Sequence, residues 1–312
     1  MCWCQEGKGS SDWRIAVRPI RDGDIWVGVS CRYRSLTLQD GCLSCSSVET
    51  NRHTTIVAIT NQKGGVGKST TAINLAATLS FRGKRILVVD LDPQGNATSG
   101  FGLDRGAVRV STYDVLIGGA AIEDAVEGTS YRDLFVVPAT IDLAGAEIEL
   151  VSMFSRELRL RNALRDMDDE YDFVLMDCPP SLGLLTVNAL AAADEVLIPI
   201  QCEYYALEGL SQLMQNIELV SGNLNPELGI GGVVLTMYDG RTNLSADVVA
   251  QVREFFGEIA YRTVIPRSVR LSEAPSYGQP IEAFDPMSRG AIAYRQLGRE
   301  FIDRHQGGEN AE

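Results

Sequence analysis

The chain has 312 residues, of which 45% are hydrophobic, so it is long enough to bury one large core or two smaller ones. Its net charge of −13 argues against a protein coated in basic surface for nucleic acid, although a local arginine cluster is compatible with that total. The sequence lacks an apolar run of roughly 18 residues and a basic-then-apolar amino terminus, so we expect a cytoplasmic protein without membrane attachment.

The first 52 residues differ in composition from the rest. They hold five of the seven cysteines and show no hydrophobic periodicity. Zinc or an iron–sulfur cluster could be bound by Cys2, Cys4, Cys42 and Cys45, but their spacing fits no common site. We expect residues 1–52 to be a disordered extension or the product of a misassigned start codon, with Val48 as an alternative start.

From residue 53 onward, strand-like and helix-like segments alternate. A β-branched run at 55–60 predicts a strand, a glycine-rich stretch follows, and apolar residues at helical spacing over 72–79 predict a helix ending at Gly83. The other predicted strands are 85–90, 134–137, 173–176, 196–200, 230–235 and 262–265. The other predicted helices are 146–167, 207–220, 244–256 and 290–305.

This alternation predicts one α/β domain over residues 53–305. We expect a doubly wound, mostly parallel sheet with helices on both faces and a ligand at the carboxyl ends of its strands. Residues 306–312 are predicted to be a polar tail.

The glycine-rich stretch predicts a phosphate-binding loop of the P-loop NTPase type. Its glycines let successive backbone N–H groups point at a polyphosphate, and the following helix dipole adds positive potential. Lys68 is expected to bridge the terminal phosphates of ATP, and Ser69 to ligate Mg²⁺. The glycine that usually stands five residues before Gly67 is replaced by Gln62, and an extra lysine, Lys63, follows it. The predicted nucleotide-binding residues are Lys63, Gly64, Gly65, Val66, Gly67, Lys68, Ser69 and Thr70.

Carboxylates follow two of the predicted strands. Asp177 closes a buried strand, a position from which it reaches the magnesium shell through water. Asp90 and Asp92 end another strand; they either cap a turn before Pro93 or face the γ-phosphate, where a carboxylate orients the attacking water.

Cys178 and Cys202 are interpreted as small buried packing residues. The two histidines, His53 and His305, lie far from both cysteines in the sequence, which excludes acyl transfer of the Cys-His type.

Several motifs together resemble the ParA/Soj family of chromosome- and plasmid-partitioning ATPases, which carry a deviant Walker A motif. They are residues 63–70 (KGGVGKST), 90–96 (DLDPQGN) and 177–183 (DCPPSLG), and the match continues through 201–209, 235–244 and 265–276. The resemblance covers about residues 54–302.

The resemblance implies a slow ATPase switch in which two subunits sandwich two ATP molecules. In this family Lys63 reaches the partner's nucleotide, Asp92 activates water with Asp90 beside it, and Asp177 is the Walker B carboxylate. Pro266 matches a loop that contacts adenine.

The resemblance also implies nucleoid association. The ATP-bound dimer binds DNA without sequence preference, and a ParB-like centromere-binding partner stimulates hydrolysis. The matching DNA-binding arginines are Arg241 and Arg270, and we expect Arg267 and Arg289 to extend their patch.

Three alternatives compete with this interpretation. A membrane-attached division-site regulator would need an amphipathic carboxyl-terminal helix, whereas residues 303–312 are polar and acidic. An iron–sulfur carrier would need paired cysteines at the dimer axis. A nucleotide-binding adaptor without turnover stays open, because slow hydrolysis is normal for switches.

Overall fold

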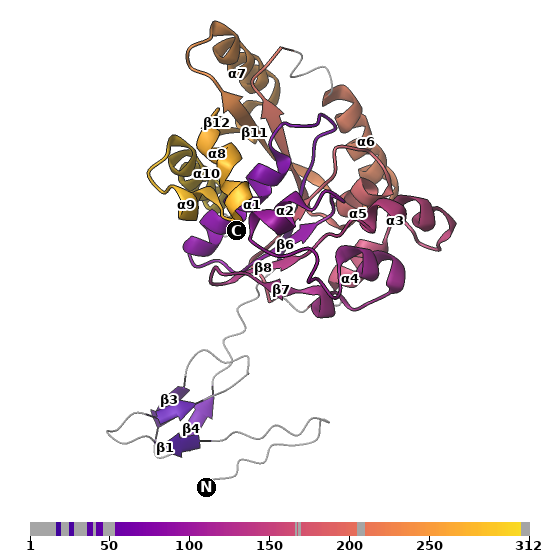
Figure 1. Ribbon diagram of the computed structural model, residues 1–312, viewed down its shortest axis with the longest axis vertical. Helices are drawn as coiled ribbons and strands as arrows, with labels where there is room; N and C mark the ends of the chain where they lie inside the picture. Colours follow the sequence, from indigo (N-terminus) through magenta and orange to yellow (C-terminus); the bar gives the residue numbers. More distant parts are fainter. Residues whose placement is uncertain are drawn as a thin grey trace. The chain divides into compact units, whose positions relative to one another are not determined.

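The computed structural model describes residues 54–165, 167, 170–204 and 210–306, together with four short strands nearer the amino terminus (Figure 1). The chain divides into two units, Met1–Asn51 and Arg52–Glu312. In the first, β1 (Val17–Pro19) pairs antiparallel with β2 (Ile25–Val27), and β3 (Leu36–Gln39) with β4 (Cys42–Cys45). Cys2, Cys4, Val48, the side chains of β4 and residues 307–312 lie outside the description. The interpretations of residues 1–52 and of the tail stay predictions.

The second unit is built on an eight-stranded sheet in the order β12–β11–β10–β5–β9–β6–β8–β7. All neighbouring strands are parallel except β7 and β8, which are antiparallel. The strands are β5 (Thr55–Ile59), β6 (Ile86–Asp90), β7 (Glu127–Gly128), β8 (Leu134–Val137), β9 (Phe173–Asp177), β10 (Glu195–Gln201), β11 (Gly229–Tyr238) and β12 (Ala260–Pro266). The predicted doubly wound, mostly parallel sheet is therefore confirmed.

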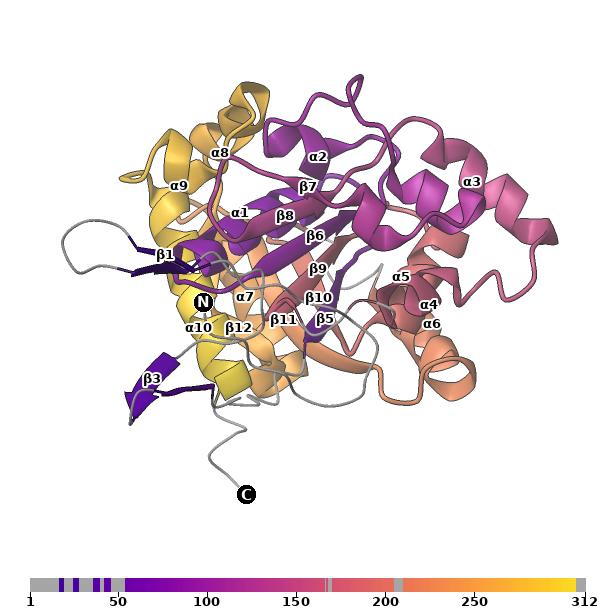
Figure 2. The ribbon, with the colours of Figure 1, turned by 90° about the horizontal axis from the view of Figure 1, so that it is seen from below.

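Helices cover both faces of the sheet, each over its own apolar core (Figure 2). Leu75, Leu79, Tyr294 and Phe301 belong to the core under α1 (Lys68–Phe81) and α10 (Arg289–Gln306), on the face that also carries α2 (Asn96–Gly100), α8 (Val269–Glu273) and α9 (Ile281–Phe284). The opposite core lies under α3 (Leu143–Glu149), α4 (Arg159–Arg165), α5 (Leu184–Ala192), α6 (Leu210–Asn223) and α7 (Asn243–Phe256).

The two edges of the sheet differ. Edge strand β7 has two residues. At the other edge, the Glu300 carboxylate on α10 accepts hydrogen bonds from the backbone amides of Arg262 (2.7 Å) and Thr263 (3.0 Å) on β12. Two backbone donors of edge strand β12 are thus bound by a side chain.

The single helix predicted at 146–167 is wrong. The structure has α3 and α4 instead, separated by a stretch in which Ser155 adopts a left-handed conformation (φ +49°). Ile148, Val151 and Phe154 continue the apolar pattern but are exposed, so no buried face holds the helix together here. Arg156 also binds the carbonyl of Val151 with its guanidinium.

Two further differences concern helix positions. The sequence pattern did not reveal α2 and α5, both short and each following a proline-containing turn. The described part of α6 begins at Leu210, and the predicted start at residue 207 lies outside the described residues.

Candidate nucleotide-binding site

The loop between β5 and α1 has the backbone of an anion cradle. Gly65 (φ +74°) and Gly67 (φ +91°) are left-handed, a conformation that L side chains rarely adopt. Gly67 is the residue preceding α1, whose amino terminus has neither a side-chain cap nor an acidic residue in its first turn. Open space surrounds the positions where Gly64 and Gly65 would carry a Cβ. The first amides of α1 are therefore available to an anion.

Side chains from neighbouring strands hold this loop in place. The Thr236 hydroxyl, near the end of β11, donates to the carbonyl of Val66 at 2.7 Å. The buried Asn61 amide donates to the carbonyl of Pro199 on β10 at 2.8 Å, while its oxygen accepts from the backbone N–H of Lys63 at 3.0 Å. The loop is thus shaped before any ligand arrives, which lowers the cost of ordering it on binding.

The two lysines of the loop differ in environment. Lys68 is buried, and its Nζ donates to the carbonyl of Lys63 at 3.4 Å. Burial lowers the pKa of Lys68, while the nearby charges of Asp177 and Asp92 act in the opposite direction. Lys63 is exposed and makes no side-chain hydrogen bond or ion pair with described residues. Lys68 therefore points into the site, and the Lys63 ammonium is available to a ligand or a second subunit.

Asp90 and Asp177 end neighbouring parallel strands and face each other in register. Asp177 is fully buried, and neither of its carboxylate oxygens has a hydrogen-bond partner among the described residues. Burial raises the pKa of Asp177 well above its usual value, and Asp90 adds to this, whereas Ser69 and Lys68 oppose it. A buried carboxylate without a partner is costly, so its position favours a cation or ordered water beside it.

Asp90 binds the chain that follows it. Its Oδ1 accepts from the backbone N–H of Asp92 at 3.1 Å, and its Oδ2 accepts from both the N–H (2.8 Å) and the hydroxyl (2.7 Å) of Thr98 on α2. Burial raises the pKa of Asp90 to about 6 although these hydrogen bonds lower it. Both oxygens of Asp90 are thus occupied in holding the loop that carries Asp92.

Asp92 itself is buried, and its Oδ1 accepts from the N–H of Gln94 at 2.9 Å. Its charge acts on Lys68 and on Asp177. The structure therefore gathers Lys68, Ser69, Asp92 and Asp177 at the carboxyl ends of β5, β6 and β9, the edge predicted for the ligand.

The residues expected to contact adenine and DNA lie at the carboxyl ends of β11 and β12. Pro266 ends β12, Arg241 follows β11, and the Arg267 amide donates to the carbonyl of Tyr238 at 2.9 Å. Arg270 lies on α8 and Arg289 begins α10. No described hydrogen bond or ion pair joins these residues to the phosphate loop.

Three of these four arginines are paired with carboxylates. Arg241 binds Asp239, and Arg267 binds Glu203 at 2.7 Å. Arg270 lies 3.1 Å from Glu273 and 3.5 Å from Asp285. Arg289 is exposed and makes no ion pair with described residues. The arginine cluster is thus largely neutralised within the isolated subunit.

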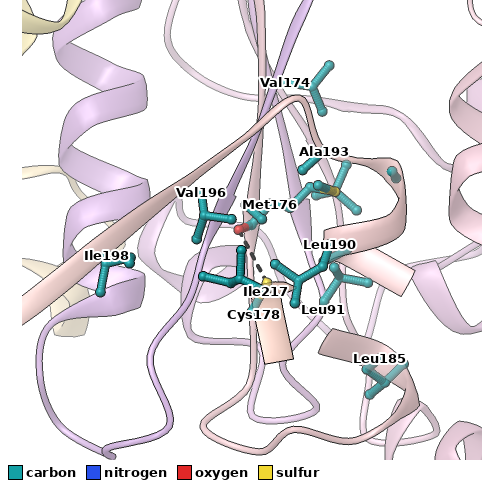
Figure 3. Close-up of a cluster of buried hydrophobic side chains, with 14 of the residues drawn as sticks. Leu91, Val174, Met176, Cys178, Leu185, Leu190, Ala193, Val196, Ile198 and Ile217 are labelled. Atoms are coloured by element: carbon teal, nitrogen blue, oxygen red, sulfur yellow. Dashed lines mark hydrogen bonds between the residues drawn. The ribbon is translucent and has the colours of Figure 1, made fainter. Parts of the chain in front are cut away.

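Cys178 and Cys202 are buried free cysteines, as predicted. Figure 3 shows Cys178 near Leu91, Leu190 and Ile217, with its thiol toward the carbonyl of Met176. Burial raises the pKa of the Cys178 thiol above its ordinary value and that of Cys202 to about 12. His305 is bound to Glu195 at the start of β10, so it lies at the amino-terminal ends of the strands, away from both cysteines. Neither thiol is activated as a nucleophile.

The sequence pattern did not reveal three polar residues that shape the site: Thr98, Arg105 and Thr236. Thr98 and Arg105 bind residues 8 to 12 positions before them in the chain, and Thr236 binds Val66 from a distant strand. Thr236 lies in the matching stretch 235–244, but no side-chain role was predicted from the sequence for any of the three. Among the described residues, no group of three or more His, Cys, Asp and Glu side chains is placed to hold a metal. A magnesium ion here would need oxygen ligands from the nucleotide, which is its usual coordination in such sites.

Comparison with known proteins identifies the family. A family model described as an AAA domain matches residues 54–230. The sporulation initiation inhibitor protein Soj of Bacillus subtilis is 58% identical over 245 residues, 78% of this chain and 97% of that protein. The chain belongs to the ParA/Soj family of partitioning ATPases. Another ParA/Soj member, the chromosome partitioning protein ParA of Myxococcus xanthus, is 55% identical over 249 residues, 80% of this chain and 88% of that protein.

A solved structure extends the comparison beyond the ParA/Soj relatives. Cobyrinic acid a,c-diamide synthase from Mycobacterium smegmatis, with bound ADP and magnesium, has a TM-score of 0.72 and 38% identity, covering 82% of this chain and 97% of that one. The predicted family and ATPase activity are confirmed. Of the helices within the described residues, none is sufficiently long and apolar to cross a bilayer.

Proposed function

We propose that this ParA/Soj ATPase is an ATP-driven DNA-segregation switch. In this proposal it binds ATP with Mg²⁺, pairs with a second copy around two nucleotides, and then binds duplex DNA without sequence preference. A ParB-like partner stimulates hydrolysis and releases the DNA. The observation that carries the proposal is the buried, unpartnered Asp177 carboxylate beside Lys68 and Ser69 at the open phosphate loop.

The residues of the site divide the work of binding and hydrolysis. The loop amides from Gly64 to Thr70 and the Lys68 ammonium bind the phosphates, and Pro266 borders the adenine. Ser69 would supply a hydroxyl to Mg²⁺, and Asp177 would hold the ion through water. When bound, Mg²⁺ neutralises charge that develops on the phosphate oxygens. Asp92 orients the attacking water, and Asp90 keeps Asp92 in place through its bond to the Asp92 amide.

The exposed Lys63 supports the dimerisation in this proposal. Its ammonium has no intramolecular partner among described residues, so it is available to the phosphates of a nucleotide in a second subunit. Two-fold symmetry would then repeat the arginine cluster and double the phosphate contacts. This doubling supports DNA binding in the ATP state by a chain whose net charge is −13 and whose arginines are partly neutralised.

The test combines mass and DNA affinity. Light scattering should show a doubled mass with a non-hydrolysable ATP analogue and a monomer with ADP. Duplex binding should require the analogue, ignore sequence, and weaken linearly with salt on logarithmic axes. Equal DNA affinity in ADP would contradict the nucleotide switch, and an unchanged mass would contradict the sandwich.

Arginine variants test the DNA surface separately. Arg241→Ala and Arg270→Ala should each weaken binding to all duplexes alike and flatten the salt slope by about one unit. Arg299→Ala is the matched control. Arg299 is exposed on α10 next to Glu300, which binds the Arg262 amide near the start of β12, whereas the proposed DNA-binding residues Arg241 and Arg267 follow the carboxyl ends of β11 and β12. Normal binding by both variants would move the DNA surface elsewhere.

A further inference from the structure

Arg105 clamps the loop that carries Asp92. It lies in the segment after α2 and reaches back across the surface. Its Nη1 donates to the carbonyl of Gln94 at 2.6 Å, and its Nη2 donates to the carbonyl of Pro93 at 2.9 Å. Both carbonyls belong to the short loop between Asp92 and α2, so one planar guanidinium binds two neighbouring peptide units.

Gly95 makes room for this clamp. It has a left-handed conformation (φ +61°), and a Cβ at this position would lie 2.6 Å from Arg105 Nε and 2.8 Å from its Cζ. The Arg105 Nε is buried and has no hydrogen-bond partner among described residues. The guanidinium thus fits closely against Gly95 although one of its donors is left unbound there.

The clamp is connected to the Asp92 carboxylate through a single peptide group. The carbonyl of Pro93 and the N–H of Gln94 belong to the same planar peptide unit. Arg105 holds its oxygen, while its N–H donates to Asp92 Oδ1 at 2.9 Å. Rotation of this peptide would break both hydrogen bonds, so Arg105 restrains the group that orients the Asp92 side chain.

Asp92 is therefore held from two sides. Inside the protein, the Asp90 carboxylate binds the Asp92 amide, and at the surface Arg105 fixes the peptide that binds the Asp92 carboxylate. Such a linear chain of hydrogen bonds, ending in a positive charge, polarises each of its members. Asp90 is buried, whereas Arg105 is half exposed and can be substituted without opening the core.

We propose that Arg105 is a positioning residue for ATP hydrolysis, acting through the Pro93–Gln94 peptide on Asp92. This inference rests on the proposed water-orienting role of Asp92. Arg105 makes no hydrogen bond or ion pair with the phosphate loop, so its removal should slow turnover and leave nucleotide affinity nearly unchanged. Lysine cannot bind both carbonyls in the planar, two-point manner of arginine.

The experiment compares Arg105→Ala, Arg105→Lys and the control Arg109→Ala in the full chain with Mg²⁺ and ATP, with and without duplex DNA. Arg109 is exposed and makes no hydrogen bond or ion pair with described residues. Arg105→Ala should lower kcat about tenfold, since small misplacements of a positioned group have effects of this size. Its Kd for an ATP analogue and its unfolding temperature should stay close to wild type. The kcat of Arg105→Lys should lie between those of Arg105→Ala and wild type, and the kcat of Arg109→Ala should match wild type.

Double variants separate positioning from a general structural role. If Arg105 acts through Asp92, Arg105→Ala should lower single-turnover hydrolysis no further once Asp92→Ala is present. The role of Arg105 alone would be overturned if Arg105→Ala slowed hydrolysis by the same factor in the Asp92→Ala protein as in wild type. It would also be overturned if Arg105→Ala had a normal kcat while Asp92→Ala was slow. Normal turnover in Asp92→Ala would overturn the role of Asp92 and, with it, this inference. Wild-type protein without any ATP turnover would contradict the proposed function itself.

Discussion

Asp239 and Arg241 form a two-point ion pair at the surface beside the carboxyl end of β11. Arg241 Nε lies 2.9 Å from Asp239 Oδ1, and Nη2 lies 2.6 Å from Oδ2. The Arg241 side chain is 87% exposed, so the pair is screened by water and contributes little to stability. A DNA phosphate that binds Arg241 must nevertheless compete with this carboxylate, which takes two of the five guanidinium donors.

Removing the Asp239 charge should therefore strengthen DNA binding. We expect Asp239→Asn to raise the affinity of the ATP-bound protein for duplex DNA modestly, by several-fold at most, because the pair is exposed and screened by water. Fluorescence anisotropy at several salt concentrations measures the effect. Asp247→Asn is the control, because it removes an equal charge from an exposed residue of α7 without an ion pair among described residues. Equal gains in both variants would show that only net charge matters.

The two loop lysines should separate nucleotide binding from dimerisation. Lys68→Ala removes the buried ammonium beside Asp177 and Asp92, so binding of an ATP analogue should be lost. Lys63→Ala removes an exposed ammonium, so much of the binding should survive while the mass stays that of a monomer. Calorimetry measures nucleotide binding, and light scattering measures the mass. Equal loss of binding in both variants would mean that Lys63 acts only within its own subunit.

Asp177→Asn should stabilise the nucleotide-free protein, because it removes a buried charge that has no hydrogen-bond partner among described residues. The gain should be on the order of 1 kcal/mol in free energy of unfolding at neutral pH, because the variant loses the charge but its amide still needs hydrogen-bond partners. The pKa of Asp177 is raised in the folded state, so wild-type stability should fall as pH rises above the ordinary carboxyl range, and this fall should be smaller in the variant.

The unfolding temperatures of wild type and Asp177→Asn, each measured with and without Mg²⁺ and ATP, test whether Asp177 belongs to the metal site. Ligand that binds only the folded state raises the unfolding temperature. Wild type should show an increase that depends on magnesium, and the variant should lose most of it. An unchanged magnesium-dependent increase would remove Asp177 from the metal site.

His305 should make stability depend on pH near neutrality. Its Nδ1 lies 2.7 Å from the carbonyl of Phe301 and its Nε2 lies 3.0 Å from Glu195 Oε1, and both partners only accept. The ring must therefore donate from both nitrogens as the imidazolium. Burial lowers the pKa of His305, but Glu195 and the Phe301 carbonyl outweigh it and raise the pKa.

Because the folded-state pKa of His305 is raised, its contribution is complete below the ordinary histidine pKa. It should be lost as pH rises through the higher folded-state value. Urea unfolding of wild type and His305→Gln across this range tests the effect. The difference between the two proteins should shrink as pH rises, and a constant difference would mean that protonation of His305 is not involved.

Deleting residues 1–51 should leave the unfolding temperature, ATP turnover and DNA binding unchanged, because the chain divides after Asn51 and β5 begins at Thr55. Metal analysis of the full chain should accompany the deletion. Loss of activity together with a bound metal would instead make the cysteine-rich segment a functional domain.

The sequence predicted the phosphate loop and central strands because those signals are local. The glycines between a β-branched run and an apolar helical pattern leave few other structures for 55–81. The helix at 146–167 failed because its apolar periodicity continues through Phe154, which is 95% exposed. Periodicity cannot tell whether a surface exists to cover such residues.

The contacts that position Asp92 could not be predicted from the sequence, for a different reason. Arg105 and Thr98 meet the Asp92 loop only after the chain has folded back on itself, and an isolated arginine or threonine is an ordinary surface residue in sequence. Asp90 Oδ1 accepts from the Asp92 amide two residues on, which is a local contact, whereas the bonds of Oδ2 to Thr98 need the intervening turn to form. Roles that depend on tertiary hydrogen bonds produce no periodic pattern in the sequence, so they cannot be predicted from periodicity.

The two edges of the sheet also decide how copies of this protein can aggregate. Open edge strands are templates for adding a strand from another molecule. At one edge β7 offers two residues, and at the other the Glu300 carboxylate binds the amides of Arg262 and Thr263. Strand-by-strand growth into fibrils is therefore disfavoured at both edges. Glu300→Ala should expose these amides of β12 and increase aggregation when the protein is concentrated or heated. In the wild type, α10 prevents this as long as it stays packed against β12.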